Sequence, residues 1–150
     1  MTIKTSEPPA TTALEVAASF TRLLKENDHA AAAATYNADN IVSIEPFDGP
    51  MWLCCGKEEV RRKCEQWRES YQIHSSHVEG PYVNGDEFIV RFKMDVTSMA
   101  TGRRMTIDEV GLYVVAHGKI VTETFCSLRI DQRLACVTPA ETRFSGPMYW

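Results

Sequence analysis

The hydrophobic pattern of this chain changes its period near residue 71, and this change limits the folds open to it. Before that point, apolar side chains recur at the three- to four-residue spacing of amphipathic helices. After it they recur at every second residue, most clearly in FIVRFKMDV, residues 88–96. Asn84-Gly85 precedes this run and is a strong signal for a tight hairpin turn. Long strands joined by tight turns predict a twisted antiparallel sheet after a helical first half.

Helices are expected in three segments of the first half. The first begins at a capping box formed by Thr12 and Glu15. Asn27 or Asp28 can cap a short second helix in HAAAAATY, and Gly56 precedes the third. Three helices followed by a sheet predict an α+β domain, in which the helices cover one face of a curved, mostly antiparallel sheet.

The length of 150 residues fits one domain. We expect this domain at residues 12–130, after a disordered leader at 1–11 and before a C-terminal tail at 131–150. No apolar run approaches the ~20 residues that a membrane-spanning helix needs. The net charge is −4 and the basic residues form no stripe, so we expect neither a membrane nor a nucleic-acid partner.

The cysteines and histidines suggest neither a disulfide framework nor a metal site. Five cysteines at scattered positions indicate reduced thiols and a cytoplasmic location. No CxxC spacing exists, and His74 and His77 should lie on opposite faces of a strand, so no metal is expected. A glycine-rich phosphate loop is also absent, and we expect no cofactor. Arg61, Arg62 and Lys63 share a predicted helix with Glu58, Glu59 and Glu65, which predicts a solvated helix face with i,i+4 ion pairs.

Glu45 is the first candidate for proton transfer. It follows the apolar run IVSI and precedes Pro46-Phe47, at the end of a predicted strand. Removing a carboxylate from water is costly, and loss of water generally raises the pKa of such a group. A carboxyl group that titrates near neutral pH can serve as a general acid or base. A solvated glutamate at a strand end explains the pattern equally well.

The order of the elements, with the motifs YNADN, IEPF, GKEEV and VAHGKIVTETF, resembles the nuclear transport factor 2-like superfamily. It is most similar to the SnoaL-like and ketosteroid-isomerase-like branch, over roughly residues 12–130. The resemblance implies a cone-shaped α+β domain, a fold that hosts isomerases, dehydratases, cyclases and non-catalytic binders. It also implies that Glu45 occupies the position of the catalytic aspartate of ketosteroid isomerases. Phe20 and Gly111 stand where those enzymes carry their two oxyanion-hole donors, and neither can donate a side-chain hydrogen bond.

The resemblance further implies which residues of the predicted strand RMTIDEVGLYVV, residues 104–115, face the helices. Ile107, Glu109, Gly111 and Tyr113 would point inward, so that Glu109 is a second carboxylate in the cone. The alternating residues, from Asp108 to Val114, would form an outer face apolar enough to be covered by a second copy of the chain. A register shift of one residue would exchange the two faces and bring Asp108 inside. Glu123 either faces the interior or is a charge at a strand edge.

Two functions remain open at this stage. The first is a cofactor-independent isomerase, dehydratase or cyclase acting on a small hydrophobic molecule, with Glu45 as base and Glu109 as acid partner. The second is a non-catalytic module that binds a hydrophobic ligand or mediates dimerisation. In either case we expect the ligand to contact Phe20, Trp52, Val90, Phe92, Ile107 and Tyr113.

Overall fold

The computed structural model describes residues 12–128, and the predicted leader and tail lie outside the described residues. Within these described residues, three helices and six strands follow one another in the order αα-ββ-α-ββββ. Their bounds are α1 Ala13–Lys25, α2 His29–Tyr36, β1 Asn37–Ile44, β2 Leu53–Cys55, α3 Lys57–Ser70, β3 Tyr71–Asn84, β4 Glu87–Ser98, β5 Arg104–Ala116 and β6 Lys119–Ser127.

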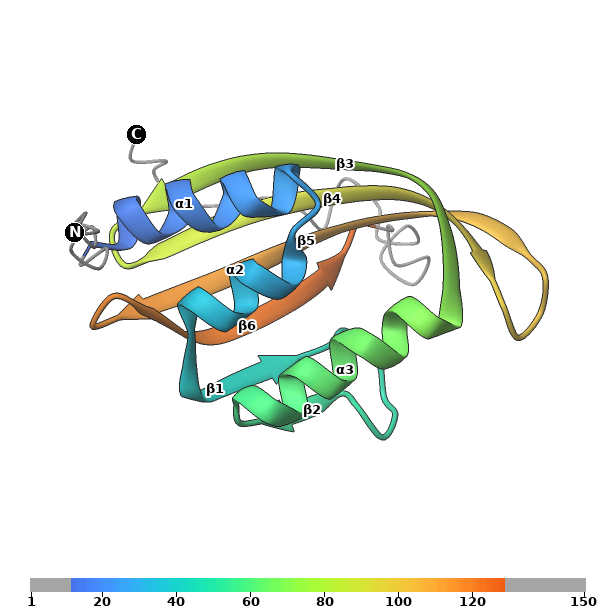
Figure 1. Ribbon diagram of the computed structural model, residues 1–150, viewed down its shortest axis with the longest axis horizontal. Helices are drawn as coiled ribbons and strands as arrows, with labels where there is room; N and C mark the ends of the chain where they lie inside the picture. Colours follow the sequence, from blue (N-terminus) through green and yellow to red (C-terminus); the bar gives the residue numbers. More distant parts are fainter. Residues whose placement is uncertain (1–11, 129–150) are drawn as a thin grey trace, which may run out of the picture.

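The strands form one curved sheet in the order β2-β1-β6-β5-β4-β3. Every neighbouring pair is antiparallel except β1 and β6, which run parallel. All three helices lie on the concave face, with α1 across β3 to β5 and α3 across β1 and β2 (Figure 1). The predicted α+β class and the mostly antiparallel sheet are therefore confirmed. No helix in residues 12–128 is long and apolar enough to cross a lipid bilayer.

Local sequence signals set the ends of these elements as predicted. Thr12 caps α1 through a hydrogen bond from the Glu15 backbone N–H, and the Glu15 side chain accepts one from Thr12 in return. Asp28 caps α2 by accepting a hydrogen bond from the Ala31 N–H. Gly85 has a φ of 60° in the turn between β3 and β4, a conformation that glycine adopts without strain.

The core fills the space between α1 and the central strands. Phe20 of α1 packs edge-to-face against Phe88 of β4 and Tyr113 of β5, with ring centroids 5.9 and 5.0 Å away. Phe88 and Tyr113 stack on each other at 4.9 Å. Both rings are almost fully buried, so this part of the concave face is filled by its own side chains.

The pairing of β4 with β5 fixes which side chains of β5 face the helices. Glu109 is directly opposite Phe92, and Tyr113 is opposite Phe88, both of which are buried in the core. Directly opposed residues of an antiparallel pair share one face of the sheet. Glu109 therefore lies on the inner face, as the resemblance implied. Asp108 lies on the outer face.

Candidate functional site

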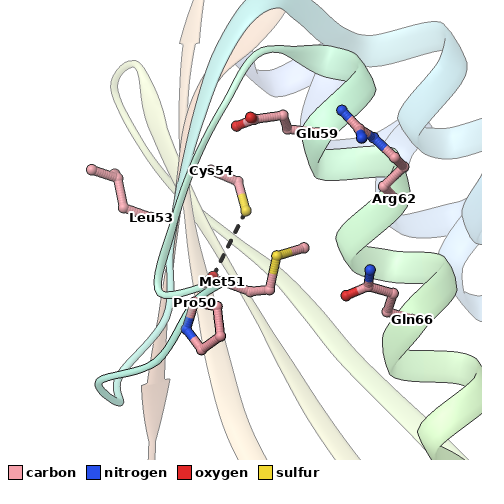
Figure 2. A pocket seen from close by; sticks show the side chains of 7 residues that line it. All are labelled: Pro50, Met51, Leu53, Cys54, Glu59, Arg62 and Gln66. Carbon is pink, nitrogen blue, oxygen red and sulfur yellow. Dashed lines mark hydrogen bonds between the residues drawn. The ribbon is translucent and has the colours of Figure 1, made fainter.

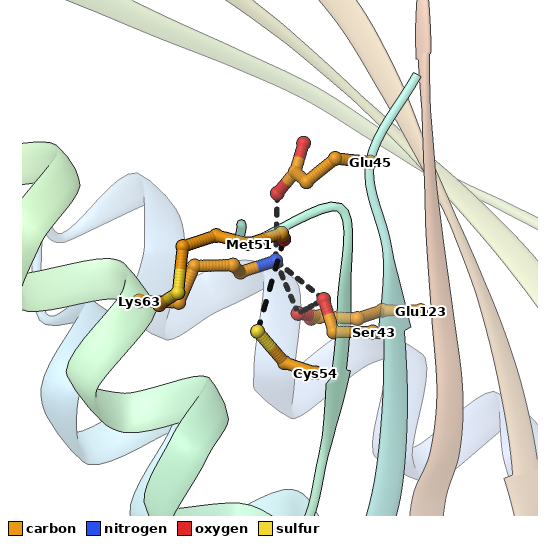
Figure 3. A network of polar contacts seen from close by, with 6 residues as sticks. All are labelled: Ser43, Glu45, Met51, Cys54, Lys63 and Glu123. Carbon is orange, nitrogen blue, oxygen red and sulfur yellow. Dashed lines mark hydrogen bonds and ion pairs between the residues drawn. The ribbon is translucent and has the colours of Figure 1, made fainter. Parts of the chain in front are cut away.

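A buried lysine and its carboxylate partners occupy the inner face of the sheet beneath α3, where β1 lies beside β6. The Lys63 ammonium group donates a hydrogen bond of 2.6 Å to Oε1 of Glu45 and another to the Ser43 hydroxyl. It also lies 3.6 Å from Oε1 of Glu123, to which Ser43 donates a hydrogen bond of 2.6 Å. Figure 3 shows these side chains converging on the lysine nitrogen. Glu109 of β5 is coupled to Glu45 and Lys63 by their charges. We call these five residues the inner polar cluster (Ser43, Glu45, Lys63, Glu109 and Glu123).

Strand alternation brings the carboxylates of this cluster together. Ser43 and Glu45 are two residues apart at the end of β1, so both point to the same side. Ser43 is paired with Glu123 of β6, which places the Glu123 side chain on the inner face as well. Of the two readings of Glu123, the structure supports the interior one, since the residue is 6% exposed.

The position of Lys63 corrects the sequence analysis. Arg61 behaves as predicted, pairing with Glu58 and Glu65 on the exposed face of α3. Lys63 was assigned to the same solvated face, and that prediction is wrong, because Lys63 is only 8% exposed. The signal that could have revealed it is its spacing, three residues after the buried Val60 and four before the partly buried Trp67.

The charges of the cluster act on one another because little water separates them. Burial lowers the pKa of Lys63, but the carboxylates of Glu123 and Glu45 more than offset this effect and raise it overall. Burial raises the pKa of Glu123, although Lys63 and the Ser43 hydrogen bond oppose the shift. Lys63 is therefore an ammonium ion near neutral pH, and it cannot act as a base toward the Ser43 hydroxyl that it contacts.

Glu109 is the carboxyl group best tuned for proton transfer. It lies half-buried on the inner face of β5, next to the half-buried Ile107 and Phe125. Burial raises its pKa to about 7, with a further increase from the negative charge of Glu45 and a decrease from Lys63. At neutral pH this carboxyl group exchanges readily between its protonated and ionised forms, as a general acid or base must.

Tyr113 reaches back along β5 over Gly111, toward the side of Glu109. A methyl group placed on Gly111 would lie 2.8 Å from the Tyr113 hydroxyl oxygen, closer than real contacts allow. The missing side chain of Gly111 is therefore what makes room for the tyrosine ring. Burial raises the pKa of Tyr113 well above its ordinary value, so its hydroxyl stays protonated and can donate a hydrogen bond.

The remaining predicted contact residues differ in their access to a ligand. Phe20, Val90 and Phe92 are buried in the core, at 4%, 0% and 7% exposure. Ile107 is half-buried beside Glu109. Trp52 is 47% exposed in the turn before β2, where its carbonyl accepts a hydrogen bond from the Glu45 N–H. The structure thus brings Ile107 near the Glu109 carboxyl group and leaves Trp52 exposed in the turn before β2.

A small cleft lies next to the inner polar cluster. It has a volume of about 170 Å³ between α3 and the β1–β2 connection (Figure 2). Met51 and Cys54 line this cleft and also stand beside Lys63, as Figures 2 and 3 together show. A larger groove of about 700 Å³ runs between the end of α1 and the edge strand β3, and its walls include His74 and His77. Within residues 12–128, no three histidine, cysteine or acidic side chains are grouped as a metal site would require.

Comparison with known proteins identifies the family. The model of the SnoaL-like domain matches residues 11–127 of the chain. A crystal structure from Mesorhizobium loti, described as a candidate SnoaL-like polyketide cyclase with carbohydrate phosphatase added in brackets, is 55% identical. The match covers 77% of this chain and 98% of that one, with a TM-score of 0.75.

More distant structures share the fold. A nuclear transport factor 2-like protein from Burkholderia thailandensis is 19% identical, over 83% of this chain and 94% of that one, with a TM-score of 0.66. A candidate isomerase from Bacillus subtilis is 17% identical, over 75% and 86% of the two chains, with a TM-score of 0.61. No curated protein matches the sequence. Because the family model matches residues 11–127, this chain belongs to the SnoaL-like domain family.

Proposed function

We propose that this protein is a cofactor-independent enzyme of the isomerase, dehydratase or cyclase type, which transfers a proton on a small apolar substrate. Glu45 acts as the base, and Glu109 acts as the acid partner that returns or delivers a proton. The Tyr113 hydroxyl donates a hydrogen bond to an oxygen atom of the substrate. A relative that is 55% identical is described as a candidate polyketide cyclase, which supports this reaction class.

The observation that carries the proposal is the environment of Glu109. Its carboxyl group lies on the inner face with a pKa of about 7, beside apolar side chains and near an ion-paired Glu45. Two carboxyl groups held in different environments divide the work of acid and base, because one keeps its proton while the other is ionised.

The charges of the inner polar cluster also select the substrate. The cluster contains three carboxyl groups and one ammonium group, and the ammonium is already bonded to Glu45 and Ser43. A substrate with its own carboxylate or phosphate would be repelled, whereas a neutral molecule could lie against Ile107 and Phe125. We therefore propose neutral, mainly apolar carbonyl compounds as the substrate class.

Hydrogen–deuterium exchange tests this proposal without knowledge of the physiological product. The protein is incubated in D₂O with a panel of neutral cyclic and aromatic ketones, and loss of the proton next to the carbonyl is followed by NMR. We expect exchange above the buffer rate, lowered by about 100-fold or more in Glu45→Gln and in Glu109→Gln. Asp108→Asn is the matched control, since its carboxylate is on the outer face. Equal rates for Glu45→Gln, Glu109→Gln and the wild type would reject the assigned roles.

The alternative is a non-catalytic module that binds a hydrophobic ligand. It is favoured by Phe20 and Gly111, which provide no hydrogen-bond donor at the two positions where ketosteroid isomerases have one, and by the packed interior around Phe88. Binding of a panel ketone that raises the melting temperature without any exchange would support this alternative over the enzyme.

We also propose that the protein forms a homodimer through the outer face of the sheet. Val110, Leu112 and Val114 are only half-buried there, and Ile89 and Tyr82 beside them are 37% and 55% exposed. Leu112→Glu should convert the protein to a monomer in sedimentation experiments. A wild type that is monomeric at micromolar concentration would contradict this proposal.

A cytoplasmic location is also proposed. It is supported by the free thiols of Cys54, Cys55, Cys64 and Cys126.

A further inference from the structure

The proposed reaction gives no part to Lys63, although this residue is the buried cation of the inner polar cluster. Its nitrogen reaches three acceptors, Ser43 of β1, Glu45 just after that strand, and Glu123 of β6. It also lies 5.0 Å from the centre of the Phe125 ring, at a distance that allows a cation–π contact. The side chains of Glu45 and Glu123 are only 16% and 8% exposed, so water contributes little to their solvation.

We propose that Lys63 is a positioning residue, which fixes the Glu45 carboxylate on the inner face and supplies the positive charge that lets the three carboxyl groups of the inner polar cluster lie close together. This inference rests on the proposed function for its meaning in catalysis, but not for its test. Without the ammonium group, Glu45 loses the hydrogen bond that orients its carboxylate. Glu109 and Glu123 lose the positive charge that favours their ionised forms.

Other groups around Lys63 cannot replace it. The groups that contact its ammonium are carboxylates, a hydroxyl and an aromatic ring, so the ammonium is the one positive charge inside the inner polar cluster. Arg62, its neighbour on α3, lines the small cleft between α3 and the β1–β2 connection instead. The titratable groups coupled to Lys63 or to its partners are Glu45 just after β1, Cys54 from β2, Cys64 from α3, Glu109 and Tyr113 from β5, and Glu123 from β6. Arg68 of α3 acts on Cys64.

The test reads the Glu109 carboxyl group directly in the ligand-free protein. Side-chain carboxyl carbons of glutamate are labelled with ¹³C, the Glu109 resonance is assigned by its loss in Glu109→Gln, and its midpoint is measured by NMR titration. In Lys63→Met we expect the midpoint to rise by at least about 0.5 pH unit, because the cation no longer favours the ionised form. Lys63→Arg keeps the charge and should return the midpoint to the wild-type value. Arg62→Met is the matched control and should leave it unchanged.

A merely structural lysine would give a different result. If Lys63→Met folds and titrates Glu109 at the wild-type midpoint, or if Lys63→Arg shifts the midpoint as much as Lys63→Met does, the proposal is overturned. Should Lys63→Met not fold, the double variant Lys63→Met/Glu123→Gln removes one buried charge of each sign, and the same rise is expected in it. Because no substrate is present, these outcomes are independent of whether the protein catalyses exchange.

Discussion

Asp108 and Glu109 are neighbours on one strand, yet the two faces of the sheet push their titration in opposite directions. On the outer face, two hydrogen bonds from Arg91, of 2.9 and 3.0 Å, lower the pKa of Asp108. On the inner face, burial raises the pKa of Glu109 to about 7. The side of the sheet therefore decides which carboxylate stays ionised and which can exchange a proton at neutral pH.

The two faces of α3 repeat this contrast with positive charges. Arg61 and Lys63 are two residues apart, and each contacts two glutamates. The ion pairs of Arg61 lie in water, where such pairs contribute little to stability. The ion pairs of Lys63 lie in the interior, where removal of one partner leaves a charge that water cannot reach. Equal numbers of ion pairs thus have unequal consequences.

The largest effect is expected from Lys63→Met. The change leaves Glu45 and Glu123 without their cation, so the free energy of unfolding near pH 7 should fall by about 3 kcal/mol or more. Arg61→Met, the exposed counterpart, should leave it nearly unchanged. Urea denaturation of the three proteins gives both values. A similar loss in the two variants would remove the contrast between the faces of α3.

Glu109→Gln should have a smaller effect, and one that depends on pH. A carboxyl group whose pKa is raised in the folded state holds its proton there after the unfolded chain has released it. The wild type should therefore lose stability as the pH rises from about 4.5 to 7, by up to about 3 kcal/mol from this group. Glu109→Gln cannot titrate and should lose most of this slope, while Glu123, whose pKa is also raised, retains part of it. Identical slopes in both proteins would refute the inner-face shift.

Asp108→Asn should have the smallest effect on the free energy of unfolding. The pH dependence of this effect should have the opposite sign to that of Glu109→Gln. The pKa of Asp108 is lowered in the folded state, so its contribution to stability is present above the unfolded pKa of 3.8 and lost as the pH falls through the folded value. The variant should be slightly less stable than the wild type at pH 7 and equal to it in acid. A pH-independent difference would show that Arg91 does not hold this carboxylate.

Much of the fold could be predicted because its signals are local. The Thr12–Glu15 capping box, the Asn84-Gly85 turn and the alternation of residues 88–96 each depend on neighbours in sequence. The inward direction of Glu109 came from the resemblance, and the β4–β5 register confirms it.

The inner polar cluster could not be predicted as a unit, because it depends on how α3 lies against the sheet. In the sequence, Lys63 follows two arginines among several glutamates and therefore looks like a surface residue. Its contacts with Glu45 and Glu123 join residues 18 and 60 positions apart, which only the docking of α3 against β1 and the pairing of β1 with β6 bring together. Local patterns carry no information on such a distance.

The most direct measurement is the NMR titration of wild-type Glu109 and Asp108 in the same ¹³C-labelled sample. We expect Glu109 to titrate with a midpoint near pH 7 and Asp108 to titrate below pH 3.8. A Glu109 midpoint near 4.5, the value of a glutamate in water, would mean that the inner face does not shield this carboxyl group. The proposed acid–base chemistry would then lose its basis.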